Sequence, residues 1–153
     1  MTEESLHQTL TFTRIVPAPP AVVFAAHADA EQRARWSAPS DTAVLICDAT
    51  SFKVGGVDRF RCGSKDDPKY HGTTIYLDIV PGIRIVSSEV ITVDGNSLSA
   101  GLTTLELTPH DQGTALKLTV QVTSFVGPGM IEGNEQGYNG ALDNLVRHME
   151  GKL

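Results

Sequence analysis

The acidic side chain of Glu89 is the group in this sequence best placed to carry out chemistry. It lies in an expected strand over residues 83–93, where it shares one face with Ile85 and Ile91. If that face is turned to the interior, burial raises the pKa of the carboxyl or requires a cationic partner, and both situations are typical of functional sites. The opposite parity, with Val90 inside, places Glu89 in solvent. The sequence leaves both arrangements open.

The remaining reactive residue types show no recognisable catalytic or metal-binding spacing. The five histidines are scattered, without the short separations that bring two imidazoles to one metal ion. The motifs of serine nucleophiles and of phosphate-binding loops do not occur in the sequence. We therefore expect no metal and no cofactor. Acid–base catalysis needs a second group beside Glu89, and His71 is the one candidate that the sequence offers.

Composition and charge restrict the classes of protein to which the chain can belong. The 153 residues, 41% of them hydrophobic, suffice for one domain over 1–153 with a sizeable core. The net charge of −6 opposes binding to nucleic acid and to anionic membranes, so neither is an expected partner. The longest apolar run near the start, 21–26, is too short to cross a bilayer.

The cysteines and the first residues indicate a cytoplasmic protein. Cys47 and Cys62 lack the spacing of a redox or metal-binding pair, which favours reduced thiols. The N-terminal residues lack the basic and then apolar stretches of a signal peptide. The sequence leaves open whether the protein is a monomer or a homodimer.

The first part of the chain predicts one strand followed by two short helices. Residues 9–16 are rich in β-branched side chains, as strands are. Pro20 suits the first turn of a helix, where its missing N–H costs nothing. Asp29 with Gln32 three residues later resembles a capping box, so a second helix is expected to run to about Trp36.

From residue 42 to residue 125 the sequence predicts strands separated by turns. The clearest strand has an apolar residue at every second position from Leu116 to Val122. Asp94-Gly95 is a hairpin signal, although the polar residues after it indicate a longer loop. Consecutive strands joined by short turns favour an antiparallel sheet.

The segment 130–150 returns to helical spacing. Tyr138, Leu142 and Leu145 are separated by four and three residues, which places them on one face of a helix. Five glycines fall between residues 127 and 140, and each interior glycine costs about 0.5–1 kcal/mol relative to alanine. This cost predicts a close approach of the helix to a strand or to a ligand. The alternative is a poorly formed start of the helix.

Three short motifs carry a resemblance to a known family. They are VGG at 54–56, DIVPGIRIV at 78–86 and GYxxxLDxL at 137–145. Together with the order of the elements they resemble the family of activators of heat-shock-protein-90 ATPase homologues, within the SRPBCC superfamily. Tyr138 stands where that family more often has tryptophan. The resemblance covers about 9–149 and implies an α+β, START-like helix-grip fold, in which a curved antiparallel sheet of about seven strands surrounds a long C-terminal helix and two short helices follow the first strand.

The resemblance also implies a cavity between the sheet and the C-terminal helix. The leading functional expectation is the binding of a small, mostly apolar molecule in that cavity. One alternative is a co-chaperone-like module with a chaperone as its partner, and another is an enzyme of the cyclase or hydrolase type. An exposed apolar patch would favour the partner, whereas a closed apolar cavity of ligand size would favour the small molecule.

The expected ligand-binding set has three parts. They are the strand residues that face the interior, the apolar face of the C-terminal helix, and the aromatic residues near the two ends of the cavity. Arg59 and Arg61 are expected on the outer face of the sheet together with Tyr76 and Asp78; the alternative is an anion clamp inside the cavity. The expected ligand-binding residues are Phe24, Trp36, Phe60, Ile75, Leu77, Ile85, Glu89, Leu105, Leu118, Val120, Phe125, Met130, Tyr138 and Leu142.

Overall fold

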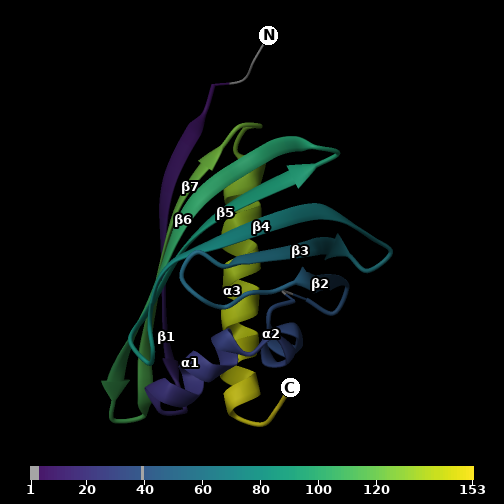
Figure 1. Cartoon of the computed structure of the whole chain (residues 1–153). Coiled ribbons are helices and arrows are strands. Elements are labelled where there is room, and N and C mark those ends of the chain that lie inside the picture. The colour runs from purple at the N-terminus through teal and green to yellow at the C-terminus, as the bar shows by residue number, and fades with distance from the viewer. Residues whose placement is uncertain (1–3, 39) are drawn as a thin grey trace.

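A strongly curved antiparallel sheet wraps around the long C-terminal helix (Figure 1). The computed structural model describes residues 4–38 and 40–153. Its elements are β1 (Leu6–Val16), α1 (Pro20–Ala28), α2 (Ala30–Trp36), β2 (Ala43–Ala49), β3 (Val57–Ser64), β4 (Asp67–Val80), β5 (Arg84–Val93), β6 (Asn96–His110), β7 (Gly113–Ser124) and α3 (Gly129–Met149). The strands lie in the order β1-β7-β6-β5-β4-β3-β2. The helix-grip fold expected from the sequence is confirmed.

The two short helices begin where proline and aspartate fix their first turns. Pro20 occupies the first turn of α1, where its missing N–H leaves no hydrogen bond unmade. Asp29 caps α2 by accepting a hydrogen bond from the backbone N–H of Glu31 at 2.9 Å. At the end of α2 the indole N–H of Trp36 donates to the carbonyl of Ala26 at 3.0 Å, which fixes the two helices to each other.

The inner face of the sheet is apolar where the sequence alternates. Leu116, Leu118, Val120 and Val122 of β7 are buried, whereas Lys117 between them is exposed. This alternation places one face of the strand against the core and the other in water, as expected from its period of two. The inner residues of β7 and of its neighbours β1 and β6 supply a large part of the hydrophobic core.

The hairpin between β5 and β6 is tighter than its sequence indicates. Asp94 and Gly95 both have a positive φ, 51° and 79°, and they alone separate Val93 from Asn96. Two consecutive residues in the left-handed region are typical of the type I′ turn that suits the twist of a hairpin. The expectation of a longer loop is wrong, because residues 96–100 begin β6.

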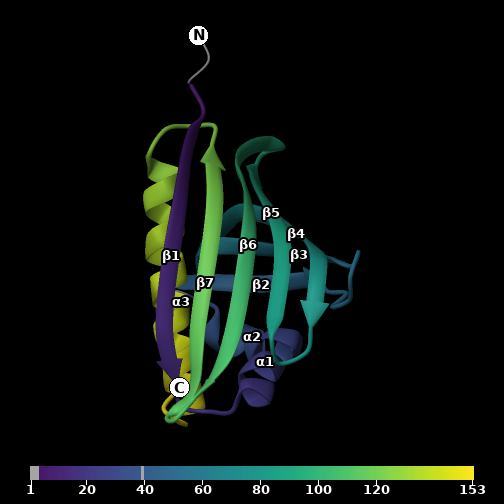
Figure 2. The same cartoon turned by 90° about the vertical axis from the view of Figure 1, so that its left-hand side faces the viewer.

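Helix α3 is held firmly at its C-terminal half. Its buried side chains, Leu142 and Leu145, are 3% and 0% exposed. Arg14 reaches from β1, which lies beside the helix (Figure 2), and forms an ion pair with Asp143 at 3.0 Å. Every described residue of 129–141 is half-buried or exposed. The N-terminal half of α3 therefore packs on the sheet through half-buried side chains, among them Ile131 and Tyr138, and none of its described residues is fully buried.

The close approach expected at the helix glycines occurs in the sheet instead. A Cβ added at Gly129, Gly133 or Gly137 would meet no atom within 4 Å, so these positions have room for a larger residue. At Gly72 of β4, in contrast, an added Cβ would overlap the aromatic ring of Phe60. Gly72 therefore makes room on the inner face for a ring that extends from β3.

This contrast predicts opposite effects for two glycine-to-alanine substitutions. Gly72→Ala is expected to lower the free energy of unfolding by about 1–3 kcal/mol, because the new methyl group must displace the Phe60 ring. Gly133→Ala is expected to raise it by about 0.5–1 kcal/mol, because alanine favours the helix and meets open space. Urea denaturation of both variants measures these changes. A neutral Gly72→Ala would contradict the packing of Phe60 on this glycine.

Candidate functional site

A small cavity lies between the sheet and the N-terminal half of α3. Its volume is about 10 Å³, which is close to the room that one water molecule needs. Pockets for drug-sized ligands are far larger, about 300–1,000 Å³, so the structure has no ligand-sized cavity at the place where the sequence predicts one. The lining residues are Glu89 of β5, Ser99, Ala100, Gly101 and Thr103 of β6, Val120 and Val122 of β7, and Asn134 and Tyr138 of α3.

Glu89 extends from the inner face of β5 into this cavity. The residues two positions away on either side, Ser87 and Ile91, are buried, as is Ile85, so the inward parity is the one that the structure shows. The Glu89 side chain is half-buried, and burial raises the pKa of its carboxyl from 4.5 to about 7. Among the described residues, none provides this carboxyl with a hydrogen bond or an ion pair.

Two further titratable groups face Glu89 across the interior. Burial, assisted by the nearby Glu89, raises the pKa of the Cys62 thiol on β3 to about 11. Burial and the same carboxyl also raise the pKa of the Tyr138 hydroxyl, whose ring packs against Phe12 with ring centroids 5.8 Å apart. Both groups are therefore neutral near pH 7, and Glu89 is the member of the three that titrates there.

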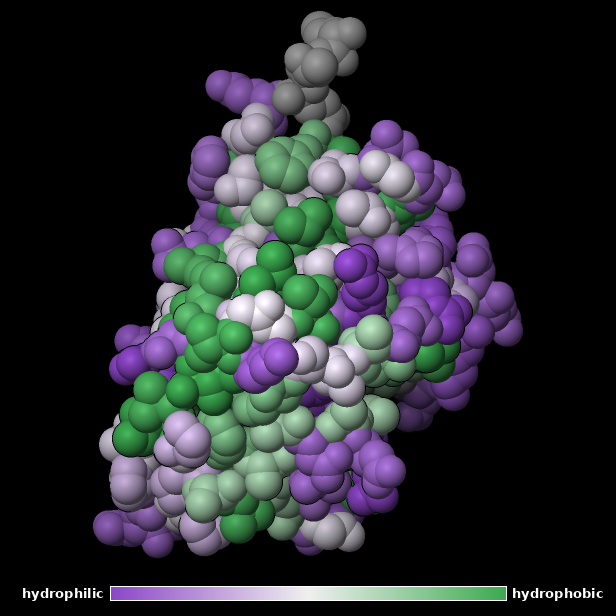
Figure 3. All heavy atoms as spheres, in the orientation of Figure 1, coloured by the Kyte–Doolittle hydropathy of each residue, from purple (hydrophilic) through white to green (hydrophobic). Residues whose placement is uncertain are grey.

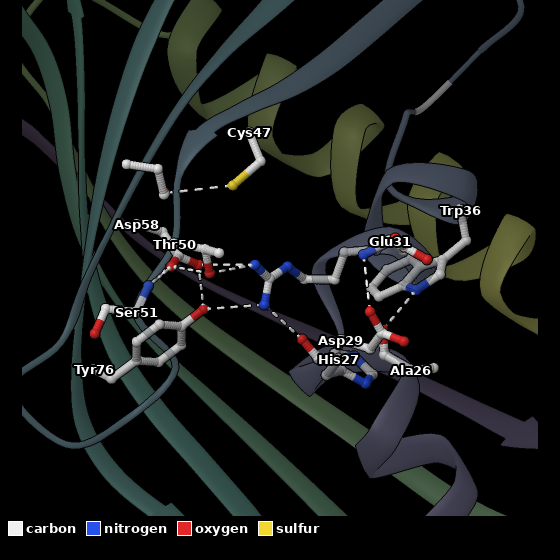
Figure 4. Close-up of polar contacts among 12 residues, drawn as sticks. Ala26, His27, Asp29, Glu31, Trp36, Cys47, Thr50, Ser51, Asp58 and Tyr76 are labelled. Atoms are coloured by element: carbon white, nitrogen blue, oxygen red, sulfur yellow. Dashed lines mark hydrogen bonds and ion pairs between the residues drawn. The ribbon is translucent and has the colours of Figure 1, made fainter.

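A second polar cluster, which the sequence analysis did not identify, joins α2 to β3 and β4 (Figure 4). Its centre is Asp58, which is 6% exposed. This carboxylate accepts hydrogen bonds from the Tyr76 hydroxyl, from the Thr50 hydroxyl at 2.7 Å and from the backbone N–H of Ser51 at 3.1 Å. Arg33 of α2 completes the cluster with an ion pair to Asp58 at 3.2 Å. We refer to these five residues as the Asp58 cluster.

The Asp58 cluster is saturated with hydrogen bonds and therefore has a structural role. Arg33 also donates to the carbonyl of His27 at 2.7 Å, so one guanidinium connects both short helices to the sheet. The His27 ring packs against Trp36, and burial lowers its pKa to about 4, which keeps it neutral. One signal could have revealed the cluster from sequence, because Asp58 shares its strand parity with Phe60.

The structure does not gather the expected ligand-binding residues around one cavity. Glu89, Val120 and Tyr138 line the cavity. Phe24 is half-buried against Phe52, with ring centroids 5.8 Å apart. Phe60 lies half-buried on the inner face over Gly72. Five other members of the set are packed in the core: Trp36, Ile85, Leu105, Leu118 and Leu142. Trp36 is therefore not at a cavity entrance.

The orientation expected for Ile75 and Leu77 requires correction. Both lie on the outer face of β4 and are 40% and 48% exposed, while Tyr76 between them is buried on the inner face. The Tyr76 hydroxyl finds its partners in the Asp58 cluster, so burying the phenol leaves no polar atom unpaired. Ile75 and Leu77 are therefore not part of the interior site.

The remaining expected residues lie away from the cavity. Phe125 is 37% exposed in the loop before α3, and Met130 is half-buried in the first turn of this helix. His71 is exposed on the outer face, so it does not converge with Glu89 as an acid–base pair. Arg61 is on the outer face as expected, where it pairs with Asp48 at 2.9 Å.

A larger hollow of about 340 Å³ is open on the outer face of β1 and β7. Its basic lining residues are Lys117, which is exposed, and Arg14, which is already paired with Asp143. We therefore place the candidate site in the interior, where an unpaired carboxyl is half-buried. The lining residues of the outer hollow are Thr13, Arg14, Ile15, Thr108, Ala115, Leu116 and Lys117.

Neither a metal site nor a membrane-spanning helix is found in the part of the chain that the structure describes. No three side chains of histidine, cysteine, aspartate or glutamate are grouped so that they could hold a metal ion there. None of the described helices is both long enough and apolar enough to cross a membrane.

Comparison with protein families and solved structures identifies the relatives of this chain. The family model described as activator of Hsp90 ATPase homolog 1-like protein matches residues 17–150. An uncharacterised protein from Rhizobium leguminosarum is 28% identical, with 96% of this chain and 97% of that chain covered and a TM-score of 0.84. The Mll3558 protein from Rhizobium loti is 35% identical, with 94% and 98% covered and a TM-score of 0.82. No protein of curated function matches the sequence.

The Asp58 cluster predicts a strong effect for Arg33→Met. The substitution keeps much of the side-chain volume but leaves the buried carboxylate of Asp58 without its cation, which is expected to lower the free energy of unfolding by about 3–5 kcal/mol. Arg61→Met is the matched control, because its ion pair with Asp48 is exposed on the outer face and should matter much less. Equal losses in the two variants, measured by urea denaturation, would show that the cluster does not hold α2 to the sheet.

The raised pKa of Glu89 predicts a pH-dependent loss of stability. The folded protein retains this proton to about pH 7, whereas the unfolded chain releases it near 4.5, so ionisation between these values disfavours the fold. We expect the free energy of unfolding to fall over this range by on the order of 1–3 kcal/mol more than in Glu89→Gln. Glu106→Gln, at an exposed position on β6, should keep the decline. Urea denaturation at pH 5 and pH 8 tests this; identical pH profiles for the two variants would contradict it.

Proposed function

The chain belongs to the family of activator of Hsp90 ATPase homolog 1-like proteins, and we propose that it binds a small, mostly apolar ligand between the sheet and the N-terminal half of α3. The observation that carries this proposal is the unpaired Glu89 carboxyl in a cavity otherwise lined by neutral side chains. A protein that needed only a filled core at this place would pair or exclude such a group. The family match supports a ligand-binding role in general terms.

Binding requires the N-terminal half of α3 to move away from the sheet, because the closed cavity holds no more than a water molecule. Opening would separate the Tyr138 ring from Phe12 and break the hydrogen bond that Arg14 donates to Asn139 at 3.0 Å, but none of the described residues of 129–141 is fully buried. Phe125 and Val126, in the loop before the helix, are 37% and 43% exposed, and they supply apolar surface at the end that opens. The C-terminal half stays in place through Leu142 and Leu145.

In this proposal the whole chain acts as one domain, whether as a monomer or as a homodimer. The two cysteines, Cys47 and Cys62, are free thiols, which agrees with the reducing cytoplasm expected from the sequence. Catalysis is not part of the proposal, because the second titratable group considered for it, His71, lies on the outer face.

A protein partner is the second candidate, and the outer face of the sheet is the observation that favours it. Ile75, Leu77 and Val90 are 40%, 48% and 36% exposed on neighbouring strands β4 and β5. Figure 3 shows hydrophobic side chains gathered over the centre and left of the view, where Figure 1 places these strands. Exposed apolar patches of this kind are typical of docking surfaces. The description of the family mentions an Hsp90 ATPase, and this is therefore the partner that we would test.

Binding of octanol to two variants distinguishes an interior site from a surface site. Val120→Ala enlarges the cavity and is expected to change the affinity for octanol at least about threefold, because the apolar chain lies against this side chain. Leu77→Ser, on the outer face, is expected to leave the affinity unchanged. Titrations followed by the NMR signals of the amides at 99–103 and 134–138 measure both. If only Leu77→Ser alters the binding of octanol, the ligand lies on the outer face and the interior site is wrong.

A further inference from the structure

The cavity beneath α3 is lined by one acidic side chain. Glu89 is acidic, and the other polar lining residues, Ser99, Thr103, Asn134 and Tyr138, are neutral. Of the described residues that line the cavity, none is basic. The apolar part of the lining comes mainly from two valines on the neighbouring strand β7. The cavity therefore has a negative polar end and an apolar side.

A half-buried ionised carboxylate is stabilised by a cation, and the chain does not provide one among its described residues. The basic side chains nearest to the fold's interior are engaged elsewhere: Arg14 pairs with Asp143 and Arg33 pairs with Asp58. Hydrogen bonds between an ammonium group and a carboxylate are about twice as strong as those between neutral groups. A ligand that supplies such a group would therefore remove the penalty of burying Glu89, whereas a carboxylate-bearing ligand would increase it.

We propose that the ligand of this site is a small amphiphilic amine, whose ammonium group donates hydrogen bonds to Glu89 and whose apolar part lies against Val120 and Val122. This inference rests on the interior site proposed above and specifies the chemistry of its ligand. The lining also contains neutral hydroxyl and amide groups, such as those of Thr103 and Asn134, whose oxygens can accept hydrogen bonds from an ammonium group.

The overall charge of the chain acts in the same direction. Its formal net charge is −6, which attracts cations and repels anions at long range. Fatty acids and other anionic amphiphiles would meet repulsion both on approach and at Glu89. An amine is favoured at both stages.

Binding of an amine at Glu89 is expected to depend on pH. The pKa of Glu89 is about 7, while the groups that face it, Cys62 from β3 and Tyr138 from α3, have raised pKa values and stay neutral in this range. The lining residues from β6 and β7 carry no charge. Since an aliphatic amine remains protonated throughout, its affinity should rise by roughly tenfold between pH 6 and pH 8, as the Glu89 carboxyl ionises.

Three ligands with the same apolar chain test the proposal: octylamine, octanol and octanoate. At pH 8 we expect octylamine to bind about tenfold or more tightly than octanol, and octanoate to bind more weakly than octanol. Glu89→Gln should remove the preference for the amine and its pH dependence while leaving octanol within about twofold. Glu106→Gln removes the same charge from an exposed position on β6 and should preserve the preference. NMR titration at pH 6 and pH 8 gives all of these affinities.

The outcomes separate this inference from the function on which it rests. Equal binding of octylamine and octanol, or tighter binding of octanoate, would overturn the amine while leaving the interior site intact. A preference for the amine that persists in Glu89→Gln, or that disappears in Glu106→Gln, would mean that the net charge and not Glu89 selects the ligand. If none of the three ligands shifts the amides at 99–103 and 134–138, the interior site itself fails.

Discussion

A single helix cannot fill the concave face of a strongly curved seven-stranded sheet, and the rest of this structure depends on how the two ends of that face are closed. At one end, α1 and α2 add their apolar side chains to those of the sheet, and Leu142 and Leu145 are buried beside them (Figures 1 and 2). At the other end α3 lies over the sheet alone. The core is densely packed where α1, α2 and α3 all cover the sheet. It is polar and incompletely filled where α3 alone covers it.

The two interior acids show how burial alone fails to identify a functional residue. Asp58 and Glu89 both extend from the inner face of the sheet, but Asp58 has four donors, among them Arg33 and Tyr76. Its environment compensates the charge, so it stabilises the attachment of α2. Glu89 has no such donors among the described residues, and burial raises its pKa. The distinguishing property is the missing partner, which points to a group that arrives from outside the chain.

The sequence determined the architecture more clearly than it determined the site. Alternation in β7, the cap at Asp29 and the spacing of Leu142 and Leu145 each follow from local rules, and the structure confirms them. The orientation predicted for Ile75 and Leu77 in β4 was wrong because this strand has apolar residues on both faces. Its inner residue, Tyr76, is settled by the partners that Asp58 and Arg33 provide from distant parts of the chain. The register shifts between Tyr76 and Asp78, and Ile79 after this shift packs against the core. The local sequence pattern does not predict this shift.

The volume of the cavity and the lack of a partner for Glu89 could not be predicted from the sequence. Both depend on how the side chains of four elements pack together. Parity left Glu89 with two possible faces, and only the neighbouring strands and α3 decide between them. The five glycines near the start of the helix were visible, but their close approach to a strand was expected and is not found at Gly129, Gly133 and Gly137. At those three positions the structure shows that packing does not require glycine.

These glycines and the half-buried Glu89 both weaken the packing of the N-terminal half of α3 on the sheet. Glycine at positions where a larger residue would fit lowers the stability of the N-terminal half of α3, by about 0.5–1 kcal/mol at each interior position. Ionisation of Glu89 near neutral pH adds a penalty to the closed arrangement of this same half, while Leu142 and Leu145 keep the other half in place. A ligand cation that neutralises the carboxylate would reverse the electrostatic part of this penalty. If the proposed ligand binds there, movement of this half of α3 is linked to the occupancy of the site, because the charge on Glu89 disfavours the empty closed arrangement and favours the filled one.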